Sequence, residues 1–88
     1  MIQEVENIKG FKVLKVSRLR MLERLRKYGC IGICDFCAEI VDEGYYVAVL
    51  NQWLCKECYE DWMRTAINYP EDMKIEQRNY EAYKEILR

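Results

Sequence analysis

Histidine is absent from this chain of 88 residues. Its imidazole is the side chain that most often acts as a general base near neutral pH, and it is the commonest metal ligand in proteins. No nucleophile–base arrangement and no pair of catalytic carboxylates stands out among the residues that are present. We therefore expect a protein that is not an enzyme, with no catalytic residue and no small-molecule substrate.

Long hydrophobic runs are also lacking, since no apolar segment approaches the ~20 residues that span a bilayer. The opening segment, MIQEVE, carries acidic charge and lacks the apolar core of a signal peptide. We expect a cytoplasmic protein that does not contact membranes.

A chain this short has room for one domain with a modest core, and such domains often obtain part of their stability from a metal, disulfides or association. Hydrophobic residues make up 51% of the sequence, which is ample for a globular fold. We expect a small zinc-stabilised α+β domain in which three segments pack as one compact unit. These segments are a basic strand–helix arm over 1–29, a four-cysteine module over 30–68 and a C-terminal helix over 69–88.

The net charge of −1 conceals an uneven distribution along the chain. Eight basic residues and one acid lie between Lys9 and Lys27, whereas seven acids and one base lie between Ile31 and Asp61. A basic arm is thus attached to an acidic module. Such an acidic surface can dock a basic partner or repel nucleic acid, and it can equally be an ordinary solvated surface.

Apolar periodicity, turn residues and capping residues predict the secondary structure. The expected elements are a strand over 11–16, a helix over 17–28, a strand over 45–50, a turn at 51–52, a return strand over 53–54, a helix over 56–68 and a helix from 71 or 72 to 87. Ser17 is a candidate N-cap of the first helix and Gly29 its candidate end, and Pro70 separates the last two helices. Residues 1–10 are weakly patterned, so we expect a loosely docked tail there.

Five cysteines in a cytoplasmic chain indicate metal ligands or reactive thiols, because disulfides are rare in that compartment and an odd number leaves one thiol unpaired. Four of them form two Cys-x2-Cys pairs separated by 17 residues. This spacing lets both sulfurs of a pair reach one ion, and four thiolates complete the tetrahedral shell of zinc at ~2.3 Å. Iron or a redox dithiol are the alternatives. The predicted ligands are Cys34, Cys37, Cys55 and Cys58.

Four protein ligands leave no open coordination position for water or substrate. We therefore predict one Zn²⁺ per chain with a structural rather than a catalytic role. Its binding free energy becomes folding free energy, so the module should unfold when the metal is removed.

The motif CDFC over 34–37, a predicted hairpin, and LCKEC over 54–58 at the start of a helix resemble a treble-clef zinc finger. The cysteine spacing is similar to that of GATA-type fingers, and the layout is similar to half of a LIM domain. This resemblance covers residues 32–68 and implies a zinc knuckle, a β-hairpin and a helix around the metal. GATA fingers read DNA with a basic module, whereas this module is acidic.

A fainter resemblance is to the sporulation anti-sigma factor Gin, a short four-cysteine protein in which the second pair leads into a helix and a tyrosine-rich segment. Here the segment YEAYKEIL over 80–87 occupies the similar place. The basic helix over 17–28 has no counterpart in that pattern. The resemblance implies that such modules bind proteins.

Cys30 lies four residues before Cys34 and is outside the two pairs. We expect a partly buried small apolar residue at this position. A redox-sensitive thiol, or a replacement ligand when another cysteine is oxidised, are the alternatives.

Seven tyrosines exceed what a core of this size needs, and tyrosine is enriched at protein interfaces. The apolar residues of the last helix fall in two stripes, which indicates two neighbours, and one of them could be another chain, including a second copy of this one. We predict a module for protein–protein interaction, either a small adaptor or an inhibitor of a larger enzyme or regulator. The residues expected to contact the partner are Tyr80, Tyr83, Leu87, Ile75 and Ile86.

Basic residues recur on one face of the helix expected over 17–28, at Arg20, Arg24 and Lys27. They form a solvated helix face or a surface for nucleic-acid phosphates. Nucleic-acid binding through this helix is therefore the alternative function.

Overall fold

The computed structural model describes residues 2–25 and 33–87, and the side chains of all of these except Ile2 and Leu25. This part of the chain is an α+β domain with a four-stranded antiparallel sheet and three α-helices. The elements are β1 (Ile2–Val5), β2 (Val13–Ser17), α1 (Arg18–Leu25), β3 (Glu43–Val47), β4 (Gln52–Leu54), α2 (Lys56–Thr65), the 3-10 turn η2 (Pro70–Asp72) and α3 (Met73–Leu87).

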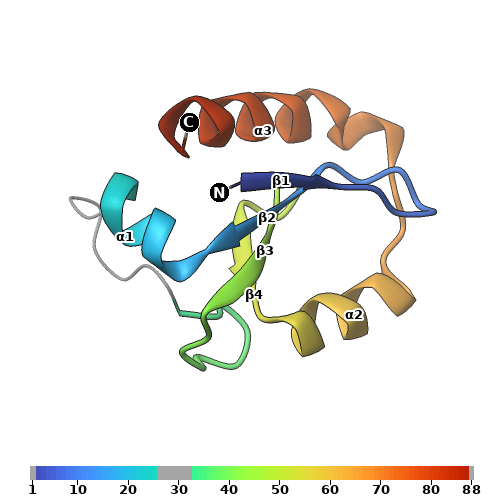
Figure 1. Cartoon of the computed structure of the whole chain (residues 1–88). Coiled ribbons are helices and arrows are strands. Elements are labelled where there is room, and N and C mark those ends of the chain that lie inside the picture. The colour runs from blue at the N-terminus through green and yellow to red at the C-terminus, as the bar shows by residue number, and fades with distance from the viewer. Residues whose placement is uncertain (1, 26–32, 88) are drawn as a thin grey trace.

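The sheet lies in the middle of the molecule, with strands in the order β1-β2-β3-β4 and helices on both sides (Figure 1). α3 runs along one face and α2 along the other. The two strands before α1 and the two strands between the cysteine pairs therefore belong to one sheet. No helix in residues 2–25 or 33–87 is long and apolar enough to cross a membrane.

Side chains that alternate along the strands form two buried clusters, one on each face of the sheet. On the α3 face, Leu14, Val16 and Tyr46 are completely buried and contact Tyr80 and Leu87 of α3. The cluster on the α2 face consists of Phe11, Val13, Cys34, Val47, Leu54, Cys55 and Tyr59. A cysteine of each pair is thus part of the second core.

The expectation of a loosely docked tail over 1–10 is wrong, because residues 2–5 form the edge strand β1. This strand pairs with β2 in a register that runs from Ile2 opposite Val16 to Val5 opposite Val13. The carboxylate of Glu4 accepts hydrogen bonds from the Tyr80 hydroxyl and from Lys84 of α3. Partners close to 80 residues away hold this strand, and a local sequence pattern cannot reveal them.

The N-cap prediction is confirmed, since the Ser17 hydroxyl accepts the backbone N–H of Arg20 at 3.1 Å. Met21 of α1 is buried, with 2% of its surface exposed. Helix α1 is described as far as Leu25. The predicted helix end at Tyr28 and Gly29 lies outside the described residues.

The hairpin between β3 and β4 turns over residues 48–51, so the turn predicted at 51–52 is wrong in its position. Asn51 takes a left-handed conformation with φ 54°, and its side-chain oxygen accepts the Tyr46 hydroxyl at 2.7 Å. Gly44 lies under the Trp53 indole, where a Cβ atom would come within 2.4 Å of the ring.

Helix α2 ends at Thr65, three residues before the predicted end. The carbonyl oxygen of Ala66 accepts a hydrogen bond from the Lys9 ammonium at 2.7 Å, and the Asn68 amide donates to the carbonyl of Lys9 at 2.7 Å. These bonds to the β1–β2 loop replace the last helical turn. The helix expected after Pro70 is confirmed as α3, which η2 precedes.

Candidate metal centre

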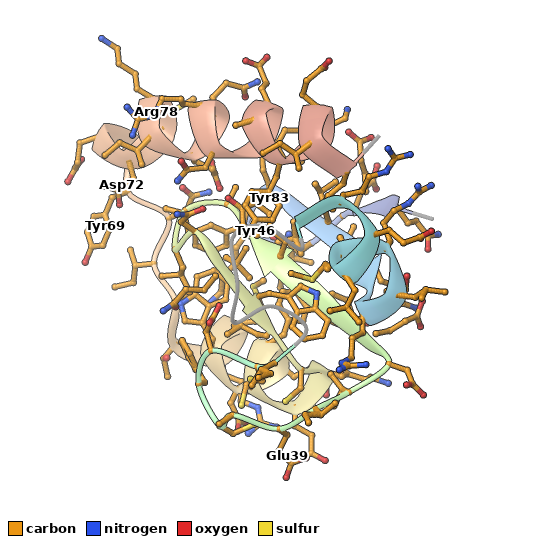
Figure 2. All side chains as sticks on the ribbon, turned by 90° about the vertical axis from the view of Figure 1, so that its left-hand side faces the viewer. Glu39, Tyr46, Tyr69, Asp72, Arg78 and Tyr83 are labelled. Carbon is orange, nitrogen blue, oxygen red and sulfur yellow. The ribbon has the colours of Figure 1, made fainter. Side chains whose placement is uncertain are left out.

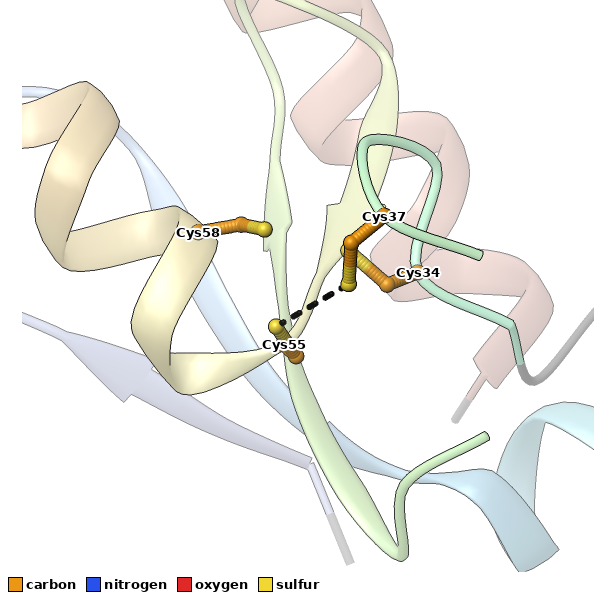
Figure 3. Close-up of side chains that lie close together, drawn as sticks. All are labelled: Cys34, Cys37, Cys55 and Cys58. Carbon is orange, nitrogen blue, oxygen red and sulfur yellow. Dashed lines mark hydrogen bonds between the residues drawn. The ribbon is translucent and has the colours of Figure 1, made fainter. Parts of the chain in front are cut away.

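The four cysteines of the two Cys-x2-Cys pairs converge between a loop and the start of α2 (Figure 3). Cys34 and Cys37 lie on a loop that is closed by an antiparallel bridge between Ile33 and Ile40. We call residues 33–40 the knuckle loop. Cys55 directly precedes α2, and Cys58 lies in its first turn.

The sulfur geometry fits a tetrahedral metal ion. All four Sγ atoms lie within 4.8 Å of one another, and the Sγ atoms of Cys37 and Cys55 are 3.7 Å apart. Metal–sulfur bonds of ~2.3 Å in a tetrahedron place the sulfurs ~3.8 Å apart, whereas a disulfide needs ~2.05 Å. The four cysteines are free thiols that could hold one metal ion.

Backbone hydrogen bonds shape the first pair into a tight turn. The N–H of Cys34 donates to the carbonyl of Glu39 at 2.9 Å, and the N–H of Ala38 donates to the carbonyl of Cys34 at 2.9 Å. Ala38 adopts φ 63°, a left-handed conformation that an L-residue takes at some cost. This turn brings both sulfurs of the pair to one side.

The sulfur of Cys34 is surrounded by groups that favour its negatively charged form. Burial raises the pKa of Cys34, but hydrogen bonds from the backbone N–H groups of Cys37, Cys55 and Phe36 outweigh it and lower the pKa to about 7. Burial, followed by the three neighbouring sulfurs, raises the pKa of Cys58. Thiolates that crowd together in this way are stabilised by a cation, which is the chemistry of a metal-binding thiol set.

Asp35, between the two cysteines of the first pair, fastens the knuckle loop to the sheet. Its N–H donates to the carbonyl of Trp53 at 2.9 Å, and its carboxylate accepts the N–H of Trp53 at 2.8 Å. Trp53 is two residues before Cys55. The edge of β4 therefore sets the distance between the two cysteine pairs.

A hollow of about 280 Å³ opens beside Cys37, Cys55 and Cys58. Its walls carry one base, Lys56, and a set of carboxylates. These acids are Glu39, Glu43, Glu57 and Asp61.

The knuckle loop exposes large apolar side chains, which the sequence analysis did not single out. Ile33, Phe36 and Ile40 are exposed by 36%, 50% and 67%. Nothing in the sequence marks them as exposed, because large apolar residues beside candidate metal ligands can equally belong to the core.

The last helix was predicted to contact a partner, but most of the residues predicted for that role pack against other parts of this chain. Tyr80 and Leu87 are buried, and Ile86 packs against the same cluster. Tyr83 stacks on Tyr46 with ring centroids 3.6 Å apart (Figure 2). Only Ile75 of the predicted set is strongly exposed, at 49%.

Two of the three residues of the predicted basic stripe lie in the part of the chain that the structure describes. Arg24 is exposed and Arg20 is half-buried on α1. Lys27 and Cys30 lie outside the described residues.

Comparison with protein-family models, with curated proteins and with solved structures finds no match to this chain.

Proposed function

We propose that this chain is a protein-interaction module, an adaptor or an inhibitor of a larger regulator, built as a treble clef around one structural Zn²⁺. A knuckle loop, the β3–β4 hairpin and α2 follow one another in the order of that fold, and the cysteines lie at its two ligand positions. Cys34, Cys37, Cys55 and Cys58 would hold the ion, which supplies folding free energy and offers no open position to a substrate.

The observation that carries the proposal is the exposure of apolar side chains on a loop whose backbone is held by hydrogen bonds. Phe36 and Ile40 are at least half exposed, while the backbone beside them is fixed by hydrogen bonds to Trp53 and within the loop. Apolar groups held rigidly in water favour association with another surface, because little conformational entropy is lost on binding.

The test is affinity capture with the zinc-loaded chain from an extract of its native cells, treated with nuclease, followed by native mass spectrometry. We expect a protein bound in a fixed stoichiometry, and we expect a strong chelator to release it. Capture of nucleic acid alone, or of nothing, would contradict the proposal.

Nucleic-acid binding through α1 is the second candidate, because Arg20 and Arg24 leave basic groups at the surface. It requires binding of duplex DNA or of RNA at low salt, with an affinity that falls steeply as salt rises. The double variant Arg20→Glu/Arg24→Glu should abolish that binding. If the unmodified chain binds neither at low salt, this candidate fails.

A further inference from the structure

We infer that the knuckle loop is a docking surface for a cationic amphipathic segment of a protein partner, with apolar side chains flanked by lysine or arginine. This inference rests on the proposed function and specifies the partner's chemistry. Two independent features of the surface support it, namely its apolar residues and its charge.

The apolar part consists of three exposed side chains of the knuckle loop. Ile33 and Ile40 are bridge partners, so their side chains project from the same side of the loop. Phe36 lies at the tip between them and is half exposed. These three exposed side chains lie on one short loop whose backbone is held by hydrogen bonds.

The charged residues on the knuckle loop and directly after it are all acidic. Glu39 belongs to the loop itself and points away from the body of the molecule (Figure 2), and Asp42 and Glu43 follow it. Glu57 and Asp61 approach from α2 along the wall of the hollow beside the sulfurs.

Part of this charge is balanced within the chain, and Lys56 lines the same hollow as four of these acids. Glu43 pairs with Lys15 at 3.6 Å, and Asp61 pairs with Arg64 at 3.1 Å. Across residues 2–25 and 33–87, Glu39, Asp42 and Glu57 form no ion pair.

Four thiolates around a divalent ion would add two further negative charges beside the hollow that four of these acids line. A partner that covers the apolar side chains must bring its own charges close to these acids. Basic groups gain from that approach, and acidic groups or a phosphate backbone are repelled. The surface thus fits a segment that combines apolar and basic residues.

The experiment is a titration of the zinc-loaded, ¹⁵N-labelled chain with three synthetic peptides. The first is an amphipathic helix of leucine, phenylalanine and lysine. The second carries glutamate in place of each lysine, and the third carries serine in place of each leucine and phenylalanine. We expect the first peptide to shift the amide signals of 33–43 and 56–61, and to bind at least about tenfold more tightly than the other two.

Two double variants separate the knuckle loop from exposed apolar residues elsewhere. Phe36→Ser/Ile40→Ser should weaken binding of the first peptide by about tenfold or more. Ile67→Ser/Ile75→Ser removes side chains with nearly the same exposure, 64% and 49% against 67% and 50%, and should leave the affinity unchanged. Unchanged folding of each variant is read from its amide spectrum and zinc content.

The inference is overturned if none of the peptides binds, if the glutamate peptide binds equally well, or if the shifted signals lie elsewhere. Self-association of the chain through 33–43, seen by sedimentation without peptide, would also overturn it and assign the surface to a second copy. If Phe36→Ser/Ile40→Ser still captures the native partner, this docking surface is wrong while the protein-interaction function stands. If the unmodified chain captures no protein, the proposed function itself fails.

Discussion

Asp35 and Trp53 are joined by two hydrogen bonds, one in each direction, although 17 residues separate them. The N–H and the carbonyl of Trp53 point away from β3, so they would face water at the edge of β4. Asp35 covers both groups. One residue therefore closes the open edge of the sheet and positions the first cysteine pair against the second.

Asp35→Ala should lower the free energy of unfolding of the zinc-loaded chain by about 1–2 kcal/mol, because the side-chain bond to the N–H of Trp53 is lost. The backbone bond from Asp35 to the carbonyl of Trp53 is kept. Asp35→Asn retains an acceptor oxygen and should lose less than half as much. Urea unfolding at constant zinc concentration measures both, and equal losses would contradict the role of this acceptor.

Metal removal should unfold the module under reducing conditions. Structural zinc contributes about 10–16 kcal/mol in zinc-finger peptides, which exceeds the stability of a domain of this size. We expect one zinc per chain by native mass spectrometry, and loss of the compact charge states after chelation. Cys55→Ser should reproduce the chelated state, because a buried thiol of the candidate metal set is lost.

A metal-free mass lower by two or four protons would mean paired cysteines and would contradict the metal centre. A chelated chain that keeps its near-ultraviolet dichroism would show that the sheet and α3 are stable without the ion. Iron in place of zinc would appear directly in the mass of the native chain.

The sequence pattern predicted the features that are determined by residues close together in the chain. Ser17 caps α1 through an atom three residues away, and the two-residue spacing within each cysteine pair follows from the reach of two adjacent sulfurs. Pro70 lies between α2 and α3 and opens η2, because a proline fits the first turn of a helix but not its interior.

The features that the sequence did not reveal depend on residues far apart in the chain. β1 is only four residues long, and its pairing with β2 and the bonds of Glu4 to α3 hold it in place. The bonds between Asp35 and Trp53 likewise exist only once the loop and β4 have met. The exposure of Phe36 could not be predicted, because no sequence rule distinguishes a core phenylalanine from one at the tip of a loop.

Gly44→Ala should destabilise the chain by about 3 kcal/mol, as expected for overpacking of a filled core. A Cβ atom at this position would lie 2.4 Å and 2.6 Å from indole carbons of Trp53 and 2.8 Å from the carbonyl oxygen of Leu54. The indole cannot move freely, because its Nε1–H donates to the carbonyl of Val16 at 3.3 Å.

The neighbouring substitution Glu43→Ala is the matched control for Gly44→Ala. It removes only an exposed ion pair with Lys15, which should change the stability by less than about 1 kcal/mol. Thermal unfolding of the two variants side by side gives the comparison, and similar melting temperatures would mean that Trp53 yields to the added methyl group.

Leu87→Ala and Ile75→Ala test which apolar residues of α3 belong to the core and which lie at the surface. Leu87 is completely buried against the sheet, so its truncation should lower the free energy of unfolding by about 2–5 kcal/mol. Ile75 is 49% exposed, and its truncation should change the stability by less than about 0.5 kcal/mol. A large loss for Ile75→Ala in dilute solution would indicate that a second chain covers it.

The stability of the chain should fall as the pH rises above about 10, because buried tyrosines are kept protonated by the fold. Burial raises the pKa of Tyr46, and burial followed by Asp35 raises the pKa of Tyr83, which stacks on it. When the pKa of a group is higher in the folded than in the unfolded chain, its contribution to stability is complete below the unfolded pKa. For tyrosine the unfolded pKa is about 10. Above that pH the unfolded chain ionises first, so each further rise in pH favours unfolding.

Tyr46→Phe removes this titration together with the hydrogen bond to Asn51. At neutral pH the variant should be less stable by about 1 kcal/mol, since a buried hydrogen bond is lost. Above pH ~10 its stability should fall less steeply than that of the unmodified chain, so the two curves converge. Urea unfolding across this range, with tyrosinate absorbance followed in parallel, measures both slopes. Parallel curves would show that ionisation of Tyr46 is not what limits the alkaline stability of the fold.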